Sequence, residues 1–166
     1  MRFGGLGARL LRAIARRESP DIQAIPPADL ERLVQAGLGP LLYSIAGAHT
    51  AAQHQLLRAA DLTARVAIGQ LVSAASEILR QAPAIAAETV LLKGMAACHR
   101  HYPAPHQRLM GDIDMLVPHR LRSALEQVLR ALGYDQRSEL PAVFYETHHH
   151  SMPFVNDKTG VWVEVH

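Results

Sequence analysis

The chain has 166 residues, of which 49% are hydrophobic and 19% are charged, so it can bury the core of one domain or at most two. Its formal net charge of +2 is too small to indicate a nucleic-acid partner. No apolar stretch is expected to span a membrane, and the single cysteine, Cys98, excludes an internal disulfide and favours a reducing cytoplasm.

Helices are predicted throughout the part of the chain before residue 85. The motif Thr50-Ala-Ala-Gln53 has the form of a capping box and is expected to open a long amphipathic helix. The apolar stripe of this helix is interpreted as core, with a partner-binding or coiled-coil face as the alternative. The helices are expected at residues 6–17, at 27–36 before the capping Gly37, after Pro40, and from about residue 50 to Ala82.

After residue 85 the pattern changes to mixed α/β, which predicts a division into a helical region, 1–85, and a second region, 86–166. The segment 156–160, Asn-Asp-Lys-Thr-Gly, is typical of a turn between two strands. Strands are expected at 89–92, 112–117, 143–155 and 161–166, and helices from 95 to about 101 and from 120 to 132.

Two aspartates begin the strand predicted at 112–117. Because side chains alternate along a strand, Asp112 and Asp114 share one face while Ile113 points into the core. Carboxylates about 5 Å apart repel by roughly 3 kcal/mol at an effective dielectric constant near 20, which a bound cation would relieve. Hard oxygen ligands favour Mg²⁺ or Mn²⁺. The alternative is a strand edge with two solvated aspartates.

Two further motifs support a phosphate-handling site. Lys93-Gly94 joins a predicted strand to a predicted helix, and such a junction exposes backbone N–H groups that suit phosphate, although Gly94 could simply make the turn. In the last predicted strand, three valines alternate with Trp162, Glu164 and His166. Glu164 can therefore be a third carboxylate, offered from a neighbouring strand.

Taken in order, these motifs resemble an uncharacterised bacterial nucleotidyltransferase family of the DNA polymerase β-like superfamily. The resemblance covers about residues 30–166. It implies an α+β fold in which an N-terminal helical region precedes a polymerase β-like core, residues 86–166, with a small mixed sheet. The segments that carry it are Leu91-Leu-Lys-Gly-Met-Ala-Ala97, Arg108-Leu-Met-Gly-Asp-Ile-Asp-Met-Leu-Val117, Ala131-Leu-Gly-Tyr134, His148-His-His-Ser-Met-Pro-Phe154 and Val163-Glu-Val-His166.

The resemblance also implies a reaction and a cofactor. Asp112, Asp114 and Glu164 are expected to hold two metal ions, Mg²⁺ or Mn²⁺, around an NTP, with ATP the expected donor and the acceptor unidentified. Gly94 is expected to form the phosphate turn. Relatives commonly have Gly-Ser at this turn, whereas Met95 follows Gly94 here. The family also implies a helical region after the third acid, so the core is expected to be truncated at its C-terminal end.

The other candidate residues surround this acidic set. Lys93 and Arg108 are expected to neutralise phosphate charge, although Arg108 can equally be a surface arginine. If the hairpin loop comprises residues 156–160, Val155 lies opposite Val161, and His150 and His166 reach the acceptor side while His149 turns away. Two alternative functions remain: a non-catalytic nucleotide- or partner-binding module, and a His/Asp/Glu metal-dependent hydrolase.

Overall fold

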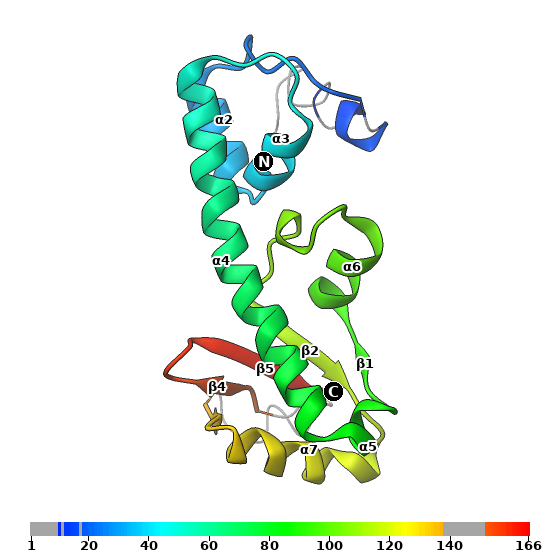
Figure 1. Ribbon diagram of the computed structural model, residues 1–166. Coiled ribbons are helices and arrows are strands. Elements are labelled where there is room, and N and C mark those ends of the chain that lie inside the picture. The colour runs from blue at the N-terminus through cyan, green and yellow to red at the C-terminus, as the bar shows by residue number, and fades with distance from the viewer. Residues whose placement is uncertain (1–9, 11, 17, 138–151) are drawn as a thin grey trace. The chain divides into compact units, whose positions relative to one another are not determined.

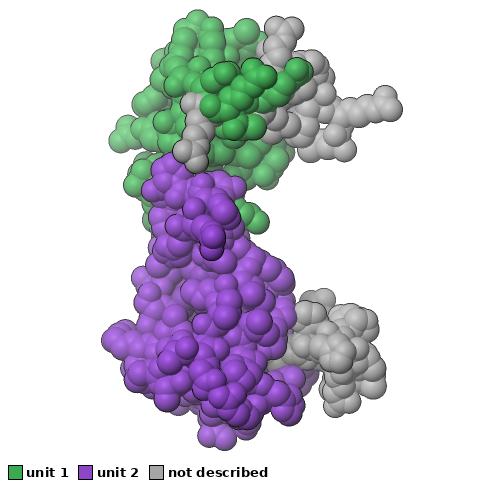
Figure 2. Space-filling model, turned by 90° about the vertical axis from the view of Figure 1, so that its right-hand side faces the viewer, with its two compact units in different colours: residues 1–66, 106–108 green, residues 67–105, 109–166 purple. Residues whose placement is uncertain are grey.

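The computed structural model describes residues 10, 12–16, 18–137 and 152–166 of a chain that divides into two compact units (Figures 1 and 2). The first unit comprises residues 1–66 and 106–108, and the second comprises residues 67–105 and 109–166. The fold is of the expected α+β class, with a helical N-terminal region and a small mixed sheet.

The first unit is built from short helices around an apolar cluster. Helix α2 (Pro27–Gln35) ends before Gly37, whose φ of 84° lies in the left-handed region that glycine adopts without strain. Helix α3 (Gly39–Ile45) begins after a connection of three residues, 36–38. Of the helix predicted at residues 6–17, residues 10 and 12–15 are helical, and residues 6–9, 11 and 17 lie outside the described residues. The buried cluster consists of Leu10, Ile22, Ile25, Leu30, Leu33, Leu42 and Leu57.

The long helix α4 (Ala51–Gln81) begins at the predicted capping box. The backbone N–H of Gln53 donates to Thr50 Oγ1 at 3.2 Å, and the backbone N–H of Thr50 donates to Gln53 Oε1 at 2.9 Å. By length and composition alone, α4 passes the test for a membrane-spanning helix, contrary to the expectation from the sequence. Its buried side chains join both hydrophobic clusters, Leu57 in the first unit and Ile68, Leu71, Ala75 and Ile78 in the second.

Among its described residues, the second unit contains a five-stranded sheet. Its strand order is β1 (Val90–Leu91), β2 (Asp112–Leu116), β5 (Val161–Val165), β4 (Phe154–Asn156) and β3 (Asp135–Gln136), and of these pairs only β2–β5 is parallel. The C-terminal part of α4, residues 67–81, and helix α7 pack with it around one apolar cluster (Figure 1). The elements are α5 (Pro83–Ala86), β1 (Val90–Leu91), α6 (Lys93–His101), β2 (Asp112–Leu116), α7 (His119–Ala131), β3 (Asp135–Gln136), β4 (Phe154–Asn156) and β5 (Val161–Val165). A short 3₁₀ helix, η1 (Pro105–Gln107), precedes β2.

Alternation along β2 and β5 separates the core from a polar face. Ile113, Met115 and Val163 are completely buried in the apolar cluster. The residues between them, including Asp114 and Glu164, belong to the opposite face of these two strands. The two central strands therefore stabilise the core with one set of side chains and carry the candidate site with the other.

The predicted register of the last hairpin is wrong. Phe154 pairs with Val163, Val155 with Trp162 and Asn156 with Val161, so four residues, 157–160, form the loop. The cause is Asn156, which ends its strand: its carbonyl accepts the N–H of Gly160 at 2.7 Å, and its side-chain oxygen accepts the N–H of Lys158. The inference that His150 and not His149 faces the acids depended on the wrong register, and both histidines lie outside the described residues.

Candidate functional site

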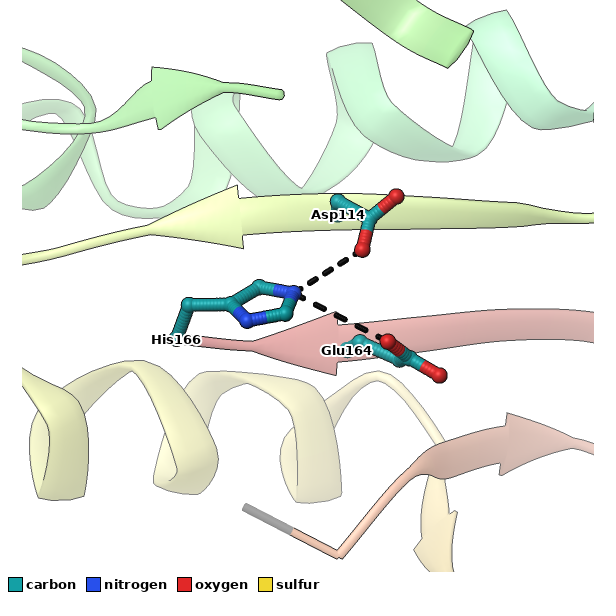
Figure 3. Close-up of side chains that lie close together, drawn as sticks. All are labelled: Asp114, Glu164 and His166. Carbon is teal, nitrogen blue, oxygen red and sulfur yellow. Dashed lines mark hydrogen bonds and ion pairs between the residues drawn. The ribbon is translucent and has the colours of Figure 1, made fainter. Parts of the chain in front are cut away.

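Asp114 and Glu164 lie directly opposite each other on the parallel pair β2 and β5. Figure 3 shows their carboxylates converging from the two strands toward His166. Asp114 is only 2% exposed, whereas Glu164 is half-buried. A carboxylate buried to this degree requires charged or hydrogen-bonding partners, because its desolvation is otherwise costly.

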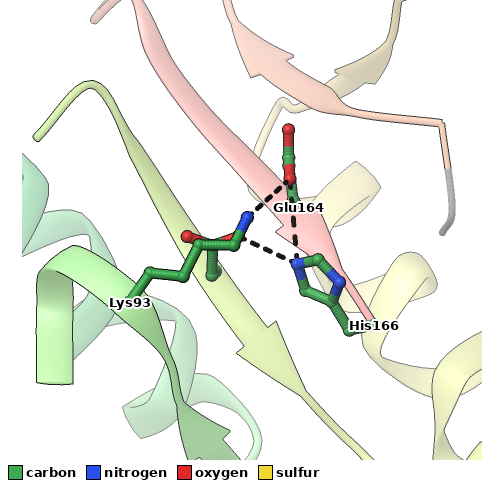
Figure 4. Close-up of polar contacts among 4 residues, drawn as sticks. Lys93, Glu164 and His166 are labelled. Atoms are coloured by element: carbon green, nitrogen blue, oxygen red, sulfur yellow. Dashed lines mark hydrogen bonds and ion pairs between the residues drawn. The ribbon is translucent and has the colours of Figure 1, made fainter.

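Lys93 supplies one of these partners. Strand β1 pairs antiparallel with β2, and the N–H of Leu92 donates to the carbonyl of Asp114 at 3.0 Å, so the β1–α6 junction lies beside the acids. From this junction, the ammonium of Lys93 lies 2.6 Å from Asp114 Oδ1 and 3.6 Å from Glu164 Oε2 (Figure 4). The predicted strand–helix junction and the predicted carboxylates thus belong to one site.

His166 supplies the other partner. Its N–H donates to the carbonyl of Met115, and its carbonyl accepts the N–H of Val117, so the ladder between the two strands extends past β5. This placement brings His166 Nε2 to 2.9 Å from Asp114 Oδ1 and 3.7 Å from Glu164 Oε2 (Figure 3). One ligand atom from each of Asp114, Glu164 and His166 lies within 4.8 Å of the other two.

The charges of these groups shift two pKa values in opposite directions. Burial acts to raise the pKa of Asp114, but the hydrogen bonds from Lys93 and His166, together with the electrostatic attraction of these groups, hold the pKa below the ordinary value. The hydrogen bond to Asp114 raises the pKa of Lys93, against a smaller effect of burial, and the charges of Asp114, Glu164 and Asp112 add to the rise. The ionised carboxylate and the charged ammonium therefore stabilise each other.

The turn predicted to bind phosphate has a different backbone conformation from the one expected. The left-handed residue is Lys93, with φ of 43°, whereas Gly94 lies inside α6. Glycine is needed at position 94 for space, because a Cβ there would lie 2.7 Å from the Cβ of Met110. The next side chain, Met95, is buried in the apolar cluster and does not cap the start of α6. The backbone N–H groups of the first turn therefore have no side-chain cap.

The remaining predicted residues are less closely placed. Asp112 precedes Asp114 by two residues on β2, is half-buried, and lies outside the three-residue ligand group found among the described residues. Arg108 belongs to the first unit and His150 lies outside the described residues, so their roles in the site stay predictions.

One buried polar cluster was not predicted, and it lies in the first unit. His106 is buried in η1, and its Nε2 lies 2.9 Å from Oδ1 of the buried Asp61. Arg65 approaches the other oxygen of Asp61 at 2.6 Å. Asp61 lies four residues after Leu57, within the apolar stripe of the long helix. This position could have predicted the cluster, because a buried acid requires a polar partner.

The donor set fits a divalent cation. The two carboxylates provide hard oxygen ligands, and the imidazole nitrogen of His166 adds a ligand that Mn²⁺ and other transition ions accept more readily than Mg²⁺ does. The ammonium of Lys93 already stands beside these carboxylates as a positive charge. These residues could therefore hold a metal ion, polarise a phosphate oxygen or accept a proton from a hydroxyl group.

A small mixed sheet with acids on adjacent central strands, next to a strand–helix junction, has the features of a nucleotidyltransferase domain. The chain belongs to the family described as "Uncharacterised nucleotidyltransferase", which matches residues 24–166. Comparison with curated proteins gave no match, and comparison with solved structures gave none. Family membership supports nucleotidyl transfer as the general reaction.

Proposed function

We propose that the protein transfers a nucleoside monophosphate from an NTP, with ATP the expected donor, to an acceptor hydroxyl. The observation that carries the proposal is the convergence of Asp114 and Glu164 beside Lys93 and the start of α6. In this reaction the acceptor oxygen forms a bond to the α-phosphorus. The bond from that phosphorus to the oxygen that bridges it to the β-phosphate breaks, and pyrophosphate leaves.

Asp112, Asp114 and Glu164 are the proposed ligands of the cofactor, Mg²⁺ or Mn²⁺, in a two-metal site. Two such ions would lower the pKa of the attacking hydroxyl and neutralise charge on the triphosphate. Asp114 and Glu164 already converge, and the period of the strand gives Asp112 the same face two residues away. His166 is close enough to both carboxylates to add a nitrogen ligand.

Proposed roles for the other residues follow from their chemistry. Lys93 is proposed to neutralise the β- and γ-phosphates, the role that the sequence also predicts for Arg108, and the backbone N–H of Gly94 donates to phosphate from the first turn of α6. No side chain caps this helix end, since the N-cap residue Leu92 makes no side-chain hydrogen bond. Glu164 accepts the proton of the acceptor hydroxyl. His150 and His166 are assigned to the acceptor side.

The catalytic core is proposed to comprise residues 86–166, which belong to the second unit apart from residues 106–108. A cytoplasmic location is proposed because the chain has a single cysteine, Cys98, and so cannot form an internal disulfide. This cysteine is buried in α6, where its thiol donates to the carbonyl of Met95 at 3.1 Å.

A labelling assay tests the proposed reaction. The protein would be incubated with each common NTP labelled at the α-phosphate, with Mg²⁺ or Mn²⁺, while pyrophosphate release and label on acceptors or on the protein itself are measured. Asp114→Asn is expected to lower the rate at least about a hundredfold, because the site loses a buried ligand. The matched control is Asp135→Asn, which changes an exposed aspartate on β3 and should leave the rate unchanged.

The same assay separates the alternatives. The inclusion of His166 in the ligand group favours a metal-dependent hydrolase as the second candidate. A hydrolase would release the labelled phosphate group to water at the same rate with or without an acceptor. NTP binding without any release of pyrophosphate or phosphate would contradict the transfer reaction and support a non-catalytic binding module.

A further inference from the structure

The ammonium of Lys93 occupies a position in which a charged group is required. Its distances to Asp114 and Glu164 are 2.6 and 3.6 Å, and among the described residues it is the only lysine or arginine paired with either carboxylate. Without a cation, two converging carboxylates of which one is buried would repel each other. The ammonium of Lys93, which lies between them, offsets this repulsion.

The backbone conformation that directs Lys93 toward the carboxylates is strained. Its φ of 43° is uncommon for a residue with a Cβ, and such a conformation persists only where the surrounding structure imposes it. Two contacts impose it here: the N–H of Leu92 donates to the carbonyl of Asp114, and Gly94 lies directly against Met110. Glycine at position 93 would adopt this φ without strain, but it would bring no charge to the carboxylates.

The side chain of Lys93 is also able to leave. It is 58% exposed, whereas the side chain of Asp114, which it contacts, is 2% exposed. An ammonium on a flexible four-carbon stem can therefore move into solvent, or to an incoming phosphate, by rotation of its own side chain alone.

We propose that Lys93 is the resident counter-ion of the acidic site and that a divalent cation binds by displacing its ammonium from Asp114 and Glu164. Displacement frees the ammonium to contact the phosphates of the nucleotide, so that cation and nucleotide binding are coupled through one side chain. This inference rests on the proposed function only in taking Asp114 and Glu164 as cation ligands.

Because the chain has only two lysines, Lys93 and Lys158, NMR of the lysine ammonium groups tests the displacement directly. In protein labelled with ¹⁵N-lysine, titration with Mg²⁺ should shift the Lys93 signal, with the same midpoint as cation binding measured by calorimetry. The signal of Lys158, which lies on the exposed turn between β4 and β5, should not move. A Lys93 signal that stays constant while the cation saturates the site would overturn the inference.

Cation affinity provides a second test that needs no turnover. Mn²⁺ binding is measured by electron paramagnetic resonance, and only the binding that is absent in Asp114→Asn is assigned to the site. The affinity of this site for Mn²⁺ should increase on the order of tenfold in Lys93→Met, because a competing positive charge is removed. Lys93→Gly should behave likewise and relieves the backbone strain, so it replaces Lys93→Met if that variant does not fold. Lys158→Met, with the same change of charge, should bind as the unaltered protein does.

The outcomes separate this inference from the proposed function. Unchanged or weaker Mn²⁺ binding in both Lys93 variants would overturn the counter-ion role while leaving the metal-dependent reaction intact. Absence of any Asp114-dependent Mn²⁺ binding, in the unaltered protein and in the variants, would overturn both.

Discussion

Glycine is required at position 94 because a neighbouring side chain leaves no room for a Cβ, and not because the backbone there adopts a conformation that favours glycine. It lies in the first turn of α6, where alanine would ordinarily be favoured by about 1 kcal/mol. Opposing this preference, a Cβ at position 94 would lie 2.7 Å from the Cβ and 3.1 Å from the sulfur of Met110. The close approach of α6 to the segment that leads into β2 therefore requires glycine.

Replacing Gly94 by alanine should lower the free energy of unfolding by about 1–3 kcal/mol, because the added methyl group overpacks Met110. Urea denaturation measures the change. Gly111→Ala is the matched control, since nothing lies within 4 Å of a Cβ at that position, and it should be neutral or slightly stabilising. In a double-mutant cycle, Met110→Gly should recover part of the loss, and strictly additive effects would contradict the proposed clash.

Tyr134 is a second residue whose chemistry is determined by its surroundings. It follows Gly133 at the end of α7, is 5% exposed and belongs to the apolar cluster of the second unit. Burial disfavours the phenolate and raises the pKa of Tyr134 above its ordinary value of 10.0. The folded chain therefore holds the proton more tightly than the unfolded chain does.

This shift predicts a loss of stability in alkali. The contribution of Tyr134 to the free energy of unfolding is complete below the ordinary tyrosine pKa, and it is lost as the pH rises through the raised pKa of the folded state. Tyr134→Phe should flatten this decline in denaturation curves recorded between about pH 8 and pH 11. Tyr102→Phe, which leaves Tyr134 in place, should decline as the unaltered protein does, and a decline just as steep in Tyr134→Phe would refute the assignment.

At the scale of elements, the start of α4 shows one side chain joining a local motif to distant backbone. Besides its capping-box bonds with Thr50, the buried Gln53 donates through Nε2 to the carbonyls of Ile22 and Ile25, at 2.9 and 3.3 Å. The capping box was recognisable because its two members are three residues apart. The bonds to residues about 30 positions earlier in the chain were not predictable from local spacing.

Variants of Thr50 and Gln53 should separate the contributions of the local and the long-range hydrogen bonds to the free energy of unfolding. Thr50→Ala removes one cap and should cost about 1 kcal/mol of unfolding free energy. Gln53→Ala should cost more, about 2–3 kcal/mol, since two backbone carbonyls also lose a donor. Gln55→Ala, an exposed change on the same helix, should stay within about 0.5 kcal/mol. Equal losses for Thr50→Ala and Gln53→Ala, measured by urea denaturation, would show that the long-range bonds contribute nothing.

At the scale of the molecule, the chain has two separate hydrophobic clusters joined by one continuous helix. The cluster of the first unit and that of the second share no residue, and α4 contributes side chains to each. The Asp61–His106 pair ties η1 to α4 within the first unit, although the chain on both sides of residues 106–108 belongs to the second. Local stability is therefore expected to differ between the two units.

Hydrogen exchange of backbone amides tests this expectation. Leu30→Ala removes a buried side chain from the first cluster, and a loss of about 2–5 kcal/mol should accelerate exchange in α2 and α3 while β2 and β5 keep their rates. Leu129→Ala, in α7, is the mirror-image control and should accelerate exchange in β2 and β5. If either variant accelerated every amide equally, the two units would unfold as one cooperative unit.

The sequence by itself determined the local features of this protein. The period of two separated Asp114 from the buried Ile113 and Met115 on β2, and Glu164 from the buried valines on β5. The capping box predicted the start of α4. These predictions succeeded because helical and strand periods depend only on neighbouring residues. The resemblance of its motifs had also indicated the family that the comparison then showed.

Only the tertiary structure decided which distant groups meet. The parallel register places Glu164 opposite Asp114, and residues 93 and 166 reach that carboxylate from outside β2. The hairpin register was mispredicted because hydrogen bonds of Asn156 set the loop length, and the Asp61–His106 pair joins residues 45 positions apart. Such contacts depend on how strands pair and side chains pack across the fold, which the local pattern of residues does not specify.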